Sequence, residues 1–135
     1  MYRHILIPTD GSELAHKAVI HGLSLAKTLG ARVSVVTVEV PFHVFDAYRN
    51  NIDRLSDAMA EHERHAKAHA SKVLGVVSDA AKAAGVACET VQADGDQPYA
   101  AIIATAKQRG CDLIVMSSHG RGGVSALVLG SETNK

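Results

Sequence analysis

Four short apolar runs alternate with segments of helical spacing along the whole chain, and this alternation most constrains its fold. The runs lie at residues 2–8, 31–40, 86–93 and 111–118. Continuous apolar strands that alternate with helices are typical of a parallel sheet covered on both faces. The sequence therefore predicts an α/β domain with an open, doubly wound, Rossmann-like parallel sheet in the order β-α-β-α-β-α-β.

The segments between these strands carry the helical pattern. Residues 12–29 and 52–84 place apolar side chains on one face, and residues 98–109 begin with a proline, which the first helical turn tolerates. A glycine follows each of the three segments and provides a natural end. Gly22 lies on the apolar face of the first helix, where it predicts a close approach to the sheet.

Length and charge exclude several classes of function. The chain has 135 residues, which corresponds to one domain, and its 14 basic and 14 acidic residues give no net charge. No surface can therefore supply the excess of Lys and Arg that a nucleic-acid partner requires. No apolar segment is long enough to cross a bilayer, and Cys88 and Cys111 do not form a metal-binding spacing. We expect a cytoplasmic protein with reduced thiols and with no nucleic-acid or membrane partner.

Two strands end in turns that have the composition of a ligand site. The first strand runs into "PTDGS" at residues 8–12, and the fourth runs into "SSHGRGG" at residues 117–123. In open α/β sheets, ligands bind beyond the carboxyl ends of the strands. Glycines allow backbone amides to approach anionic oxygens, and a helix that begins at Ser131 would add its own unpaired amides. Two glycines ten residues apart are also typical of an ordinary strand-to-helix loop.

These segments together resemble the universal stress protein family. The resemblance is carried by "ILIPTDGS" near the start, by "DLIVMSSHGRGG", and by "GS" after a gap of nine residues. The family pattern is glycine, two residues, glycine, nine residues, and then glycine with serine or threonine. Gly120, Gly130 and Ser131 match this pattern, whereas Ser117 stands where the family has its first glycine.

The resemblance implies an adenine-nucleotide-binding regulatory protein of the stress response. It places adenine against Pro8, Thr9 and Val38, and it places Asp10 near the phosphates of ATP, where Mg²⁺ would bridge the negative groups. The other residues that it implies for the nucleotide site are Met116, Ser117, His119, Gly120, Arg121, Gly130 and Ser131. Asp10 has an alternative role, because "DGS" is equally typical of an Asx turn before a helix.

The resemblance also bears on the end of the chain and on its partners. Family members continue through a helix into a final hydrophobic strand that often pairs across a dimer. Because this sequence stops at Lys135, we expect a single domain over residues 1–135 that is truncated before its final strand. The fourth strand would then be an unprotected edge. We expect a homodimer for the full-length form.

Two other functions stay open. A nucleotide-free interaction protein is favoured by Ser117, whose side chain stands where a glycine backbone would approach the nucleotide. Slow ATP hydrolysis is the other, although no serine has a demonstrable base partner, so no catalytic residue is predicted. The spacing of His62, His65 and His69 offers imidazoles to a metal in principle, but a solvated flank of the long helix is the better interpretation.

Overall fold

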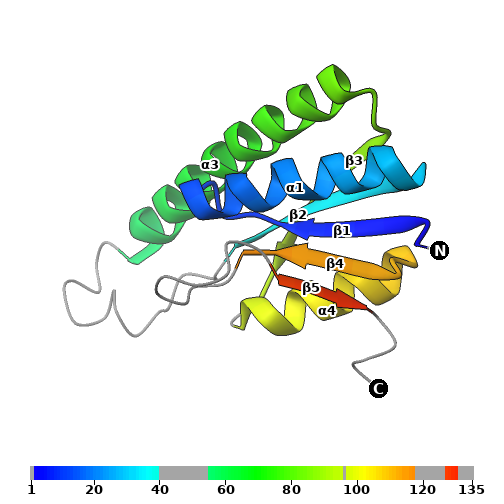
Figure 1. The fold of residues 1–135 in the computed structure, drawn as a ribbon. Coiled ribbons are helices and arrows are strands. Elements are labelled where there is room, and N and C mark those ends of the chain that lie inside the picture. The colour runs from blue at the N-terminus through cyan, green and yellow to red at the C-terminus, as the bar shows by residue number, and fades with distance from the viewer. Residues whose placement is uncertain (1, 40–54, 96, 118–126, 131–135) are drawn as a thin grey trace.

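The computed structural model describes residues 2–39, 55–95, 97–117 and 127–130, and it contains the predicted alternation of strands and helices (Figure 1). The elements, in chain order, are β1 (His4–Pro8), α1 (Glu13–Leu29), β2 (Arg32–Glu39), α3 (Leu55–Ala84), β3 (Cys88–Asp94), α4 (Pro98–Arg109), β4 (Leu113–Met116) and β5 (Leu127–Gly130). The predicted α/β fold is confirmed. The start predicted for the long helix, at residues 52–54, lies outside the described residues.

The strands form one sheet in the order β3-β2-β1-β4-β5. β1 pairs in parallel with β2 and with β4, and β2 pairs in parallel with β3. β5 pairs with β4 in the antiparallel direction, and its register places Gly130 opposite Leu113 and Leu127 opposite Met116. Four parallel strands therefore form the body of the sheet, with one antiparallel strand beside them.

The position of β5 corrects the expectation that β4 would be an unprotected edge. An edge strand presents a row of free N–H and C=O groups that readily pairs with another extended segment. The apolar residues Leu127–Gly130 provide such a segment and pair with the whole of β4. The sequence predicted a ligand turn and a helix start in this region, and the pairing of these residues with β4 was not predicted.

Helices cover both faces of the sheet. α1 and α3 lie on one face and α4 lies on the other, as Figure 1 shows. Successive side chains of a strand point to opposite faces, so Ile5 and Ile7 pack with α1 and α3, whereas Leu6 packs with α4. Among the described residues, no helix combines the length and apolarity that a membrane span requires.

Local signals explain the bounds of α1 and its contact with the sheet. The Ser12 hydroxyl accepts a hydrogen bond from the Ala15 amide at 3.2 Å, which caps the first turn. The helix ends at Gly30, whose φ of 69° is the left-handed conformation that glycine adopts readily. A Cβ atom at Gly22 would collide with the side chain of Ile7, so the predicted close approach of α1 to the sheet is confirmed.

Polar contacts join the strands at the amino end of the sheet. The Asp112 carboxylate, just before β4, accepts hydrogen bonds from the backbone amides of Arg3 and His4, with N–O distances of 3.0 to 3.2 Å. The His4 carbonyl in turn accepts a bond from the Asp112 amide at 2.9 Å. β1 and β4 are thus joined in both directions before their first ladder pair.

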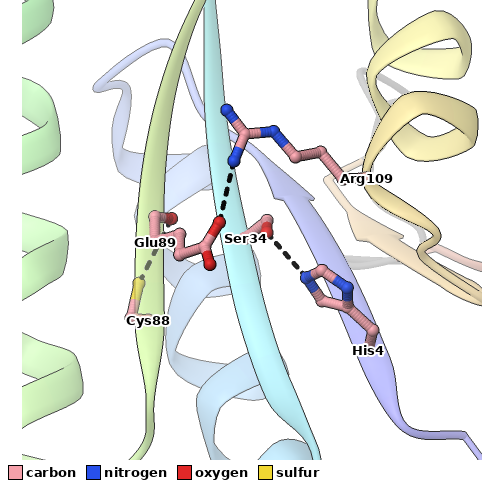
Figure 2. A network of polar contacts seen from close by, with 5 residues as sticks. All are labelled: His4, Ser34, Cys88, Glu89 and Arg109. Carbon is pink, nitrogen blue, oxygen red and sulfur yellow. Dashed lines mark hydrogen bonds and ion pairs between the residues drawn. The ribbon is translucent and has the colours of Figure 1, made fainter.

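Figure 2 shows further polar contacts at this end of the sheet. The Nε2 atom of buried His4 lies 2.7 Å from the Ser34 hydroxyl on β2. The Arg109 guanidinium, at the end of α4, donates to the Glu89 carboxylate on β3 at 2.8 Å. These contacts join β1 to β2, and the end of α4 to β3, at the amino end of the sheet.

Candidate functional site

The winding of the sheet reverses between β1 and β4. The chain passes from β1 to β2 through α1 on one face, and from β3 to β4 through α4 on the other face. β1 and β4 are nevertheless neighbours in the sheet. Ligands of open α/β sheets bind at such a reversal, outside the carboxyl ends of the strands. Pro8 and Met116 end β1 and β4 at this position.

The turn after β1 is held by a main-chain hydrogen bond to β2 and by side-chain hydrogen bonds between near neighbours. The Thr9 amide donates to the Val36 carbonyl at 2.9 Å, and the Thr9 hydroxyl accepts from the Gly11 amide at 3.2 Å. The Asp10 carboxylate accepts from the Ser12 amide at 2.9 Å. This last contact is the Asx turn that the sequence offered as an alternative role for Asp10. The turn therefore has a defined shape with the Asp10 side chain at its surface.

A pocket of about 300 Å³ opens between this turn, the end of β4 and the start of α4. This volume is at the lower end of the range of about 300 to 1,000 Å³ that is usual for small-molecule sites. Six of the residues that the sequence predicted for a ligand site line it together: Pro8, Thr9, Asp10, Val38, Met116 and Ser117. The structure thus brings the two predicted turns to one cavity.

The pocket is also lined by four residues that were not predicted from the sequence: Ala15, Val36, Pro98 and Ile102. Val36 and Ile102 have the sequence signature of core residues, and they are buried. The position of Pro98 and Ile102 near the site could have been predicted from the order of the elements. Because α4 begins soon after β3 ends, its first turns must start near the carboxyl edge of the sheet.

The pocket is apolar on its walls and polar on one side. Val36, Val38, Ile102 and Met116 supply aliphatic and thioether surface, whereas Thr9, Asp10 and Ser117 supply the polar groups. Asp10 is the one charged residue among those that line the pocket in the described part of the chain. Such a cavity suits a flat or apolar group along its wall and a polar group near the turn.

The remaining predicted site residues are placed differently. His119, Gly120, Arg121 and Ser131 lie outside the described residues. Gly130 ends β5 opposite Leu113, at the amino end of β4. Three residues of strand separate this level from Met116, which corresponds to about 10 Å. The structure therefore does not bring Gly130 to the pocket.

The three histidines of the long helix do not converge on one point. His65 Nε2 lies 3.1 Å from the Glu61 carboxylate on the exposed surface of α3. His69 Nε2 donates instead to the Asp10 carbonyl at 3.3 Å. In the described segments, no group of three or more His, Cys, Asp or Glu side chains is arranged to hold a metal ion.

A second pocket, of about 240 Å³, lies at the same edge of the sheet between α3 and the ends of β2 and β3. It was not predicted from the sequence. Its lining includes His62 and His69 of α3, Thr37 and Glu39 of β2, and Gln92 of β3. Val38 lines both pockets, so the end of β2 separates them.

Comparison with known proteins gives one consistent family. The profile of the Universal stress protein family matches residues 1–135. The universal stress protein YxiE of Bacillus subtilis is 29% identical over an alignment that covers 100% of this chain and 91% of that protein.

Solved structures show the same fold. A universal stress protein family structure from Burkholderia pseudomallei is 28% identical, with a TM-score of 0.64, and the match covers 87% of this chain and 83% of that one. A universal stress protein in complex with cAMP is 22% identical, with a TM-score of 0.65 and coverage of 92% and 82%.

Proposed function

Because the chain belongs to the universal stress protein family, we propose that it is a regulatory protein of the stress response that binds an adenine nucleotide, ATP in the first instance. The pocket between β1, β4 and α4 would be the binding site. The base would lie along the apolar wall formed by Val36, Val38 and Ile102. The phosphates would extend past Asp10 and Ser117.

One observation carries this proposal. Pro8, Thr9, Asp10, Val38, Met116 and Ser117 come from three separate segments, and all of them line one cavity at the reversal of the winding. The resemblance had implied a nucleotide site for the same six residues. The cAMP complex of similar fold is 22% identical and supports the fold alone, so the proposal rests on this convergence.

Mg²⁺ fits the proposal as a companion of the nucleotide. Magnesium sites commonly use one or two carboxylates together with phosphate oxygens and water. Asp10 would supply one carboxylate at the pocket, while its bond to the Ser12 amide holds that carboxylate in place. The remaining ligands would come from the phosphates and from solvent.

Ser117 favours a second candidate function, a nucleotide-free interaction protein. Its half-buried side chain lines the pocket at the position where the family pattern has a glycine. If its hydroxymethyl group obstructs the phosphates, the fold would serve only as an interaction module. As part of the same proposal, the protein is cytoplasmic, as its sequence led us to expect, and forms a homodimer, as the family resemblance implies.

A series of substitutions at Ser117 separates the two functions. Affinity for ATP with Mg²⁺ would be measured by calorimetry for the wild type, Ser117→Gly and Ser117→Leu. We expect binding by the wild type, tighter or equal binding by Ser117→Gly, and a loss of at least about tenfold for Ser117→Leu, whose side chain occupies the pocket. Ala104→Leu, on the exposed side of α4, is the matched control and should bind like the wild type.

Thermal unfolding provides a second readout. A ligand at one hundred times its Kd stabilises the native state by about 2.7 kcal/mol, which raises the Tm by roughly 8 °C for a domain of this size. If ATP binds to Ser117→Gly but not to the wild type, the result would support the second candidate function, a nucleotide-free interaction protein. Equal binding by Ser117→Leu and the wild type would place the nucleotide elsewhere.

A further inference from the structure

The turn that carries Thr9 and Asp10 into the pocket is contacted by side chains of a distant element, α3. His69, in the middle of α3, donates its Nε2–H to the main-chain carbonyl of Asp10 at 3.3 Å. A carbonyl only accepts, so Nε2 must carry the hydrogen. Within the turn, the side chains of Thr9, Asp10 and Ser12 accept hydrogen bonds from amides two or three positions away.

Packing reinforces this contact. Gly11 has a φ of 83°, and a Cβ atom placed on it would lie 3.6 Å from the His69 ring and only 2.7 Å from Cγ2 of Val73. Val73 is buried and lies one helical turn after His69. Two successive turns of α3 therefore press directly on the main chain of the turn, one through an apolar side chain and one through a hydrogen bond.

These contacts fix Asp10 at two points. Its carboxylate accepts from the Ser12 amide inside the turn, and its carbonyl accepts from His69 outside it. The first bond sets the side chain relative to the turn, and the second sets the turn relative to α3. Loss of the second bond would let the peptide between Asp10 and Gly11 rotate, which would move the polar side of the pocket.

We infer that His69 is a positioning residue for the nucleotide pocket: it does not line that pocket, but it orients Asp10 through the hydrogen bond to its carbonyl. The expected effect of His69 on nucleotide affinity rests on the proposed function. The expected effect of His69 on the turn does not depend on any ligand.

Two substitutions separate the hydrogen bond from the bulk of the ring. In His69→Gln the amide nitrogen is the same number of bonds from the backbone as Nε2, so the donor is kept. His69→Leu keeps an apolar side chain without a donor. His65→Leu, four residues earlier on the exposed side of α3, is the control.

Affinity for ATP with Mg²⁺ is the first readout. We expect His69→Leu to weaken binding by about fivefold, the effect of one neutral hydrogen bond. His69→Gln should bind within about twofold of the wild type, and His65→Leu should be unchanged. Equal affinity for His69→Leu and the wild type, or an equal loss in both His69 variants, would overturn the inference.

Amide hydrogen exchange of the ligand-free protein is the second readout. We expect exchange at Gly11 and Ser12 to be several-fold faster in His69→Leu than in His69→Gln, and unchanged in His65→Leu. Identical exchange in the two His69 variants would overturn the positioning role even if no nucleotide binds. Failure of the wild type to bind ATP, with faster exchange in His69→Leu, would count against the proposed function and would support the positioning role.

Discussion

At the amino end of the sheet, polar groups bond to residues far away in the sequence, whereas at the carboxyl end they bond mainly to near neighbours. His4 and Asp112 are 108 positions apart, and Asp10 and Ser12 are two positions apart. The first arrangement joins strands and closes that end. The second shapes a turn locally and leaves the space beyond it for a pocket. We therefore expect mutations at the amino end to affect stability alone, and mutations at the carboxyl end to affect binding as well.

Gly11→Ala should give the largest effect and should affect both properties. The substitution introduces a side chain at a φ of 83° and places its Cβ 2.7 Å from Val73. We expect a loss of about 3 kcal/mol in the free energy of unfolding, from left-handed strain and overpacking together. Denaturant unfolding would measure the loss, and calorimetry with ATP would show weaker binding.

Gly30→Ala is the matched control for that experiment. Gly30 has a similar φ of 69°, but a Cβ there meets nothing within 4 Å. We expect a loss of about 1 kcal/mol from backbone strain, with unchanged affinity for the nucleotide. Equal losses at the two glycines would show that α3 does not constrain the turn.

Asp112→Ala should come next in size and should affect stability alone. The substitution leaves the amides of Arg3 and His4 without their acceptor. Hydrogen bonds to a charged group contribute about 1.5 to 3 kcal/mol each, and partial exposure to water reduces the loss to about 2 kcal/mol in total. Asp79→Ala, on the exposed surface of α3, is the control. A change in nucleotide affinity in Asp112→Ala would contradict the separation of the two ends.

A smaller effect should appear as a pH dependence of stability that originates at His4. Burial lowers the pKa of His4 from its ordinary value of 6.5, the Arg32 charge lowers it further, and Glu89, the Arg109 backbone and Asp112 oppose the shift. Because the folded-state pKa is the lower one, the stabilisation is complete above pH 6.5 and is lost as the pH falls below it.

The measurement is denaturant unfolding between pH 8 and pH 5 for the wild type and His4→Gln. The glutamine amide reaches Ser34 without titrating in this range. We expect the fall in stability below pH 6.5 to be shallower in the variant. Parallel curves would mean that other groups cause the acid sensitivity.

The Glu89–Arg109 pair should give the smallest effect. The two side chains are 56% and 41% exposed, and solvent screens such a pair. We expect Glu89→Gln to cost about 0.5 kcal/mol in low salt and less at 1 M salt, where the charges are screened further. Glu63→Gln, in an exposed pair with Lys67 within α3, is the control, and its effect should be no larger.

The parts of the fold that were predictable depend on local signals. Ser12 caps the start of α1 and Gly30 caps its end, each through contacts within a few residues. α4 begins at Pro98 and ends before Gly110, as its sequence predicts. The alternation of apolar strands with helices was sufficient for the four parallel strands. Each of these features can be derived from a short window of sequence.

The parts that the sequence did not reveal depend on distant contacts. Leu127–Gly130 pair with β4 in the antiparallel direction. The sequence of these residues is equally compatible with a strand and with a turn. Val36 and Ile102 look like core residues, and only the stacking of α4 on the sheet turns them toward a pocket. The bond from His69 to Asp10 joins residues 59 positions apart, and the sequence gives no sign of it.

Val38 lines two chambers on opposite faces of a single strand end, and its side chain packs on the α4 face. Under the proposed function, a compound that fills the chamber beside α3 and shifts the main chain of β2 at this valine would change nucleotide affinity. By thermodynamic reciprocity, the nucleotide then changes the affinity for that compound by the same factor. A screen for such compounds therefore needs only one labelled nucleotide as its reporter.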